Sequence, residues 1–413
     1  MFEQTAWKHY FPIFSNHAQP QLIYLDSAAS CLTLKPVAES MYHYQCYAHA
    51  NSHRGFYQIS NKATETFELG RATVANYLSV QASEIIITQN TTEAINLVAF
   101  SYLESLLKQS PSLHDNWNIV ISVAEHHANI LPWQRLCREY QGQLRIAELN
   151  SNGLICASSL EKLVDNKTLL VAVTHVSNVL GLFNDIESIV NIAHKHSAKV
   201  LVDGAQAVSH GPVNLTKLGC DFYAFSGHKM YGPTGIGALY VRSKLLEDMA
   251  PYQVGGGIVG KVTAQNTCFV DGSEKFHAGT LNVAAVAGLT EAINFTEELG
   301  WLEIKAYQDK LANTLFDCLN TLSFVSLALP ANSSEQIPWL YSFNIDQVHS
   351  HDVSSILDSE DIAIRAGHHC AQLLYQQLDC HTSVRASIGI YNQLEDIERL
   401  ADALTLAHKM MTS

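Results

Sequence analysis

The sequence lacks the features that mark membrane, secreted and metal-binding proteins. No stretch approaches the ~18 consecutive apolar residues of a membrane span, and Met1–Lys8 shows neither the basic start nor the apolar run of a signal peptide. Nine cysteines are scattered without a Cys-x-x-Cys pair, which is typical of reduced thiols rather than of disulfides or a zinc site. We therefore expect a cytoplasmic protein that does not associate with membranes.

Charged residues are also few, and basic ones are in the minority. Lys and Arg number 25 against 39 Asp and Glu, a formal net charge of −14, so no basic stripe is available to neutralise nucleic-acid phosphates. With 47% hydrophobic and 15% charged residues, a chain of 413 residues can bury the core of one large domain and a smaller one. We expect the partners to be a small molecule and other proteins, not nucleic acid.

What the sequence does contain is an alternation of apolar strands and helical segments between residues 84 and 226. Such a βα rhythm predicts a mostly parallel sheet with helices on both faces, and ligands then gather beyond the C-terminal strand ends. Strands are predicted at 84–88, 118–123, 144–149, 169–176, 199–202 and 221–226.

The pattern changes after residue 280. Long helices are predicted over 282–321, then strands near 324–329 and 340–345 and a closing helix over 394–410. Helices followed by strands, without the earlier alternation, indicate a second, α+β domain. The predicted division is an N-terminal arm (1–20) packing on the small domain, a large domain (21–290) and a small C-terminal domain (291–413).

Two of the predicted strand ends carry residues suited to pyridoxal phosphate chemistry. Lys229 follows the strand 221–226 in a setting of small residues, a hydroxyl and an imidazole, which suits a lysine that forms a Schiff base beside a phosphate ester. Asp203 ends the neighbouring strand and can keep a pyridine nitrogen protonated. Taken singly, Lys229 also fits a solvated loop lysine and Asp203 a helix N-cap. Their joint occurrence favours the functional interpretation.

The segment 90–96 opens a predicted helix with Thr91 and Thr92 in its first turn. Free backbone N–H groups and the helix dipole make such a turn an anion site, to which a threonine hydroxyl adds a donor. The alternative is an ordinary threonine cap with Glu93 nearby.

Two other patterns invite functions that their context does not support. Gly255, Gly257 and Gly260 satisfy G-x-G-x-x-G, but no convincing strand precedes them and no clear helix follows, so we expect a flexible loop and no dinucleotide site. The pairs His126-His127 and His368-His369, the second followed by Cys370, lack further ligands at zinc-site spacing. We expect no bound metal.

Five motifs together resemble one enzyme family over nearly the whole chain. They are EHHANILPWQ (125–134), SNVLG (177–181), VDGAQ (202–206), SGHKMYGPTGIG (226–237) and RAGHHCAQ (365–372). They resemble the class V, fold-type I pyridoxal phosphate enzymes, and within them the group II cysteine desulfurases, including cysteine sulfinate desulfinases and selenocysteine lyases. The resemblance implies a fold-type I transferase: a large α/β domain with a mostly parallel, seven-stranded sheet and a smaller α+β domain.

The resemblance also implies a role for each motif in holding pyridoxal 5′-phosphate. Lys229 would bind the cofactor covalently and take the substrate's α proton, Asp203 would face the pyridine nitrogen, and His126 would lie over the ring. The implied cofactor residues are Thr91, Thr92, His126, Asn178, Asp203, Gln206, Ser226, His228, Lys229 and Thr280.

Substrate binding and sulfur transfer are implied in the same way. Arg385, helped by Arg365 and Asn178, would hold the substrate carboxylate. A surface or interdomain salt bridge is the alternative for both arginines. Cys370 would attack the sulfur of cysteine, leave alanine, and pass its persulfide to an acceptor protein. For a single cysteine, core packing is the ordinary alternative.

The oligomeric state and the substrate are left open by the motifs. Thr280 resembles a residue that reaches the cofactor phosphate of a neighbouring subunit, which implies a homodimer, but Leu281 stands where the group usually has proline. The substrate could be cysteine, cysteine sulfinate or selenocysteine. The alternative functions are another class V reaction such as transamination, and a cofactor-free persulfide carrier.

Overall fold

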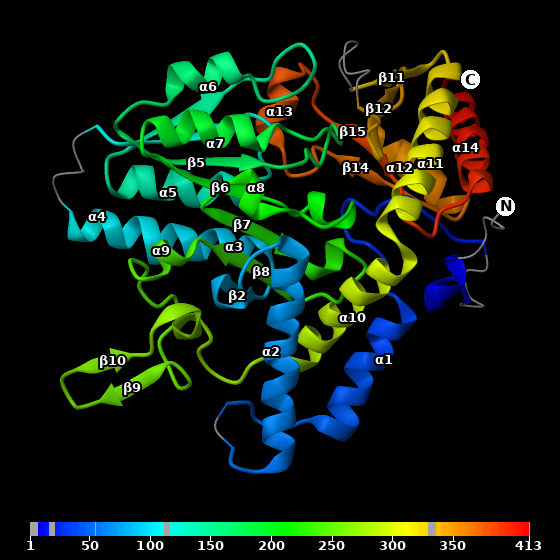
Figure 1. Cartoon of the computed structure of the whole chain (residues 1–413). Helices are drawn as coiled ribbons and strands as arrows, with labels where there is room; N and C mark the ends of the chain where they lie inside the picture. Colours follow the sequence, from blue (N-terminus) through cyan, green and yellow to red (C-terminus); the bar gives the residue numbers. More distant parts are fainter. Residues whose placement is uncertain (1–6, 16–20, 54, 111–115, 329–335, 413) are drawn as a thin grey trace.

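A seven-stranded sheet forms the centre of the larger part of the molecule (Figure 1). The computed structural model describes residues 7–15, 21–53, 55–110, 116–328 and 336–412. Within these ranges the strand order is β2-β8-β7-β6-β5-β3-β4. The strands are β2 (Ile85–Thr88), β3 (Asn118–Ser122), β4 (Gln143–Ala147), β5 (Thr168–Thr174), β6 (Lys199–Asp203), β7 (Phe222–Ser226) and β8 (Gly237–Val241).

The sheet is mostly parallel, as the sequence predicts. Strands β4, β3, β5, β6 and β7 are parallel neighbours, whereas β8 runs antiparallel to both β7 and β2. The sequence analysis missed β8, because its first residue belongs to the glycine-rich loop after Lys229 and the loop hides the strand signal. The parallel strands bring their carboxyl ends to one edge, where the candidate residues were expected.

Residues of the central strands alternate between two apolar cores. Val171 and Val173 of β5 pack with helices on one face, while Leu170 and Ala172 pack with helices on the other. This period of two, with both faces apolar, is the pattern of a sheet buried between helical layers. The surrounding helices are α3 (Thr91–Leu97), which continues through a π-helical segment (Val98–Glu104) into α4 (Ser105–Gln109), then α5 (Leu131–Glu139), α6 (Ala157–Leu163), α7 (Ile186–Lys195), α8 (Leu215–Leu218) and α9 (Ser243–Leu246).

Two long helices and a shorter one pack together beside the end of the sheet that carries β2 and β8. Helix α10 (Val283–Leu299) packs against both α1 (Lys35–His43) and α2 (Gln58–Leu78), as Figure 1 shows. The close approach needs Gly70 of α2, because a Cβ there would lie 2.1 Å from Cγ1 of Val286.

A β-hairpin projects from the body of the molecule after α9 (Figure 1). It is formed by β9 (Val259–Val262) and β10 (Thr267–Phe269), which pair antiparallel. The G-x-G-x-x-G pattern therefore runs into a hairpin strand rather than a helix. This excludes the strand–turn–helix context of a dinucleotide fingerprint, and it corrects the expected loop, because Gly260 lies within β9.

The chain after residue 300 forms a second, smaller sheet with its own apolar cluster, which includes Leu315, Phe343, Val384 and Leu400. Its order is β11-β12-β15-β14, and all neighbours are antiparallel. The elements are α11 (Trp301–Thr321), β11 (Val325–Leu327), β12 (Leu340–Ile345), α12 (Ser350–Ser359), β13 (Ile362–Ala363), β14 (Arg365–Gly367), α13 (Gln372–Gln377), β15 (Ser383–Ser387) and α14 (Leu394–Thr412).

The start of the chain joins this smaller part. Strand β1 (Ile23–Tyr24) pairs with β13, and Phe11 packs edge-on against Tyr391 with ring centroids 4.8 Å apart. Helix α10 is continuous through residue 290 and packs on α1 and α2. The division at residues 20 and 290 stays a prediction, and these contacts favour a boundary after α10 and a longer N-terminal contribution to the small domain.

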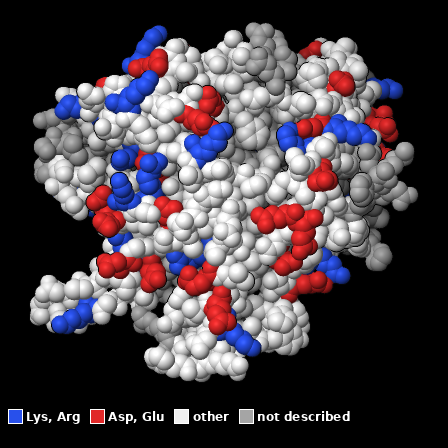
Figure 2. Space-filling view, in the orientation of Figure 1, with Lys and Arg blue, Asp and Glu red and all other residues white. Residues whose placement is uncertain are grey.

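On the face in Figure 2, acidic and basic side chains of the described residues are interspersed among large uncharged areas. No helix in the described ranges is both long and apolar enough to cross a membrane.

Candidate active site

The sheet edge predicted to carry the site borders a cavity of about 310 Å³. Nine of the ten residues predicted to bind the cofactor line it, although they come from segments far apart in the sequence. These nine are Thr91, Thr92, His126, Asn178, Asp203, Gln206, Ser226, His228 and Lys229.

Lys229 ends a short 3-10 turn directly after β7. Its Nζ donates a hydrogen bond to the carbonyl of Ala28, which also accepts a 2.9 Å bond from Nε2 of Gln206. Burial lowers the pKa of Lys229 to about 8, and the positive charge of Arg385 acts in the same direction. The lowered pKa increases the fraction of unprotonated amine near neutral pH, and a lysine must be unprotonated to attack an aldehyde.

Asp203 is the last residue of β6 and is buried. Its Oδ1 accepts a 3.0 Å bond from the backbone of Ala205. Burial raises the pKa of Asp203 to about 6, and the nearby Lys229 opposes this rise. A protonated pyridine nitrogen is the kind of cation that would stabilise the ionised carboxylate in this place.

His126 lines the cavity from a loop fixed by the neighbouring Glu125. The carboxylate of Glu125 accepts bonds from Ser122, from Asn129 (2.6 Å) and from the backbone of Thr174 (3.0 Å). Burial lowers the pKa of His126 to about 4, so its imidazole is neutral and can lie against an aromatic ring. The sequence analysis gave Glu125 no role, although it stands beside His126 in the motif.

The first turn of α3 meets the end of β7 beside the cavity. Thr91 donates its backbone N–H to Oγ of Ser226 (2.8 Å), and the two hydroxyls are 2.7 Å apart. Thr92 is exposed at the cavity. Two hydroxyls, a helix start, a buried acid and a partly buried lysine around one cavity fit the chemistry of a phosphorylated pyridine aldehyde.

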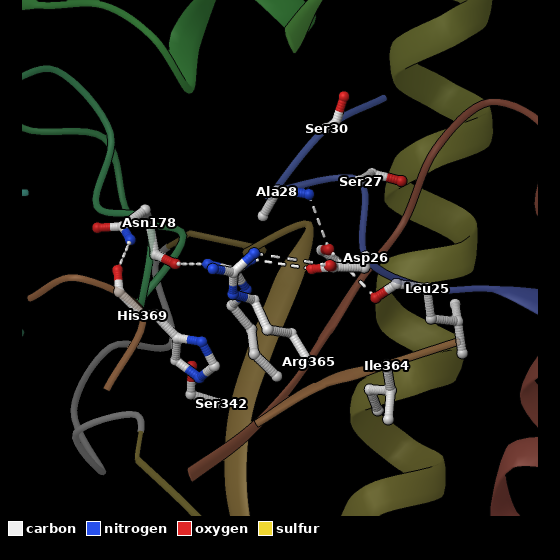
Figure 3. Close-up of polar contacts among 12 residues, drawn as sticks. Leu25, Asp26, Ser27, Ala28, Ser30, Asn178, Ser342, Ile364, Arg365 and His369 are labelled. Atoms are coloured by element: carbon white, nitrogen blue, oxygen red, sulfur yellow. Dashed lines mark hydrogen bonds and ion pairs between the residues drawn. The ribbon is translucent and has the colours of Figure 1, made fainter. Parts of the chain in front are cut away.

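Arg385 lies in β15, with a side chain only 2% exposed. Its Nη1 donates to the carbonyl of Asn178 (2.9 Å), and its Nη2 lies 3.1 Å from Oδ1 of Asp26. Asn178 in turn donates to the carbonyl of His369 (2.7 Å), as Figure 3 shows. Asn178 therefore links the cavity, the arginine and the segment that precedes Cys370.

Cys370 is held in a strained loop between β14 and α13. His369 and Cys370 have φ angles of +48° and +57°, and two successive non-glycine residues in this region are unusual and costly. The carbonyl of Cys370 accepts a 2.8 Å bond from the backbone of His127, next to His126. The thiol is partly exposed, in contrast to Cys137 and Cys220, whose pKa values burial raises to about 12.

The family model for aminotransferase class V matches residues 23–400. The chain belongs to the aminotransferase class-V family. The class V resemblance inferred from the five motifs is thereby confirmed.

Similar class V proteins include cysteine desulfurases. Those of Klebsiella pneumoniae (strain 342) and Escherichia coli (strain K12 / DH10B) are 40% identical to this chain over 97% of each sequence. Among solved structures, the apo cysteine desulfurase of Thermococcus onnurineus NA1 has a TM-score of 0.89 and 35% identity, covering 98% of this chain and 97% of its own. The cysteine desulfurase CsdA of Escherichia coli has a TM-score of 0.89 and 33% identity over the full length of both chains.

Thr280 of this class V chain does not line the cavity that holds Lys229. It is exposed and borders a separate cavity of about 400 Å³ together with His53, Glu68 and His277. Its predicted contact with the phosphate of a second subunit stays a prediction.

Of the paired histidines in this class V chain, His126 lines the cavity that holds Lys229. In the described ranges no group of three or more His, Cys, Asp and Glu side chains has the arrangement of a metal site. The rings of His127 and His368 are 5.9 Å apart beside the Cys370 loop.

The sequence analysis missed Asp26 and Ala28. The signal available for them was an acid followed by small residues, directly after a short strand.

Proposed function

We propose that this chain is a pyridoxal-phosphate-dependent cysteine desulfurase, which converts L-cysteine to alanine and leaves the sulfur as a persulfide on Cys370. One observation carries the proposal: Lys229, Asp203 and His126 line one cavity, and Asn178 joins that cavity to Arg385 and the Cys370 loop. The 40% identity to cysteine desulfurases over 97% of the chain supports the same reaction.

The cofactor, when bound, withdraws electrons from the substrate carbon. Lys229 would hold it covalently, and the free Nζ would accept the α proton of the substrate. Asp203 would keep the pyridine nitrogen protonated, neutral His126 would lie against the ring, and the turn containing Thr91 and Thr92 would hold the phosphate.

The sulfur step uses the strained loop. The Cys370 thiolate bonds to the substrate sulfur, and the C–S bond breaks with its electron pair left on carbon, which is protonated to give alanine. The outer sulfur of this persulfide then passes to an acceptor protein. We further propose that the enzyme is a cytoplasmic homodimer, that Thr280 reaches the partner's cofactor, and that cysteine sulfinate and selenocysteine are also substrates.

The function is tested by measuring alanine release from cysteine, cysteine sulfinate and selenocysteine, with and without a sulfur-accepting protein. We expect a yellow protein that releases alanine from all three, and faster turnover of cysteine with the acceptor. Amino-group transfer to a keto acid without alanine release would indicate transamination. A colourless protein that still carries sulfur would indicate a cofactor-free carrier.

The pKa of Lys229 predicts the pH dependence of cofactor attachment. Below about 8 the amine is protonated and cannot attack, so we expect the rate at which added pyridoxal phosphate joins the cofactor-free protein to rise about tenfold per pH unit and to level off above pH 8. The measurement is the growth of the visible absorbance at a series of pH values. If the attachment rate reached half its maximum only near the ordinary lysine pKa of about 10.4, burial would not lower the pKa of Lys229.

Arg385→Ala is expected chiefly to raise KM, by about tenfold to a hundredfold, because the lost charge-assisted bonds hold the carboxylate in both the ground and the transition state. Steady-state kinetics with cysteine measure the split between KM and kcat. Arg365→Ala is the comparison. The Arg365 side chain is 44% exposed, and it lies farther than Arg385 from the carboxylate of Asp26, which both arginines approach. An unchanged KM for Arg385→Ala together with a raised KM for Arg365→Ala would place the clamp at Arg365.

A further inference from the structure

Arg365 and Arg385 face each other across the edge of the smaller sheet. Arg365 of β14 and Arg385 of β15 are directly opposite in the antiparallel register. Directly opposed side chains lie on the same face, and two like charges in this arrangement repel each other. The pair therefore needs a nearby anion even before a substrate arrives.

Asp26 provides that anion (Figure 3). Its Oδ1 lies 3.1 Å from Nη2 of Arg385, and its Oδ2 lies 3.9 Å from Nη1 of Arg365. Two guanidinium charges and one carboxylate leave a net charge of +1, which one substrate carboxylate would balance. The Arg385 side chain is only 2% exposed, so its pairing with Asp26 is poorly screened by water.

The backbone around Asp26 is fixed to the strand that carries Arg385. Asp26 forms an isolated parallel bridge with Ser387, whose N–H donates to the carbonyl of Leu25 at 2.8 Å. The Ser387 hydroxyl accepts a 2.8 Å bond from the N–H of Ala28. Since Ser387 is two residues from Arg385 on β15, the carboxylate and the guanidinium are held at a set distance.

Arg385 still has N–H groups that donate no hydrogen bond. Nη1 and Nη2 bond Asn178 and Asp26, whereas Nε is buried and has no partner among the described residues. The two bonds in place fix the plane of the guanidinium, and each uses one N–H of a terminal nitrogen. The second N–H of Nη1 and of Nη2 are the donors that a substrate carboxylate would use.

We propose that Asp26 is a positioning residue for the substrate clamp: it holds Arg385 in the orientation that receives the substrate carboxylate and offsets the charge of Arg365. This inference rests on the proposed function of Arg385 as the carboxylate site. Asp26 acts through Arg385 and takes no part in the chemical step.

Asp26→Ala should therefore raise KM for cysteine about tenfold or more, while kcat changes less than about threefold. Asp26→Asn keeps an oxygen acceptor beside Nη2 but loses the charge, so its KM should lie between those of the wild type and the alanine variant. The asparagine variant carries the same test if the alanine variant does not fold. Asp358→Asn is the matched control, because Asp358 is an exposed acid lining the same cavity of about 300 Å³ as Asp26, and its KM should equal that of the wild type.

A second measurement separates positioning from general loosening of the fold. L-alanine and ethylamine are titrated into the yellow protein, and their binding is followed by the change in the visible spectrum. Asp26→Ala should weaken alanine, which has a carboxylate, by the same factor as KM, and leave ethylamine unchanged. Equal weakening of both amines would overturn the proposal.

Combining Asp26→Ala with Arg385→Ala tests whether the first residue acts through the second. In the Arg385→Ala background, Asp26→Ala should produce no further rise in KM. The same fold-increase in both backgrounds, or an unchanged KM in the single variant, would overturn the proposal. A wild-type protein without desulfurase activity would instead refute the proposed function. If Arg385→Ala raises KM and Asp26→Ala does not, the positioning role alone is wrong.

Discussion

Lys229→Ala is expected to remove the covalent attachment of the cofactor and to lower activity on cysteine, cysteine sulfinate and selenocysteine by at least about 10³-fold. The loss should extend to all three substrates because Lys229 serves as both anchor and proton acceptor, two tasks that precede the departure of sulfur or selenium. Borohydride treatment of the wild type should fix a pyridoxyl group on the peptide containing Lys229, and the variant should carry none. Absorbance, peptide mass and alanine release measure these effects.

Lys275→Ala is a suitable control for this experiment. Lys275 is also largely buried, burial lowers its pKa, and its Nζ donates to the carbonyl of Leu246, but it does not line the Lys229 cavity. The control should stay yellow and active. A Lys229→Ala protein that still formed a borohydride-stable adduct and turned over cysteine would place the anchor on another lysine.

Cys370→Ala should lose cysteine desulfuration by about 10³-fold or more, as expected when a covalent nucleophile is removed. The sulfur of cysteine is a poor leaving group and must be taken by a thiolate. A sulfinate can depart without such help and selenium leaves more readily, so activity on cysteine sulfinate and selenocysteine should largely survive. Alanine release from each substrate, with the visible spectrum as a check on the cofactor, measures this split.

Cys380→Ala is the matched control for the nucleophile. Cys380 is also partly exposed, but its Sγ is engaged by Asn344 (3.2 Å) and by the carbonyl of Thr382 (3.1 Å). This variant should desulfurate cysteine at the wild-type rate. Normal cysteine turnover by Cys370→Ala would show that the nucleophile is elsewhere, while the assignment of the cofactor would stand.

Several of the residues that line the cavity were predictable because they follow strands of the parallel part of the sheet. Asp203 ends β6, and Lys229 comes three residues after β7, so the βα rhythm alone brings them to one edge. The roles of His126 and Cys370 were not available from periodicity. They came from the resemblance of whole motifs, in which several residues occur in a fixed order.

Contacts between distant segments could not be predicted from the sequence. Asp26 is separated from Arg385 by most of the chain, and the two meet only because β1 pairs with β13 and Asp26 bridges to Ser387. Similarly, β8 pairs antiparallel between β2 and β7, a register that no local pattern specifies. Pairing between residues so far apart depends on the assembled cores, not on local preference.

The most direct test of the desulfurase assignment is the mass of the peptide containing Cys370 after the yellow wild-type protein reacts with L-cysteine and is digested without a reductant. No Lys or Arg lies between Arg365 and Arg385, so trypsin leaves Cys370 and Cys380 on one peptide, and cleavage before Asp379 is needed to separate them. We predict one extra sulfur atom on the Cys370 fragment, none on the Cys380 fragment, and one alanine released for each sulfur bound. Alanine release with an unmodified Cys370, or the extra sulfur on another cysteine, would contradict this account.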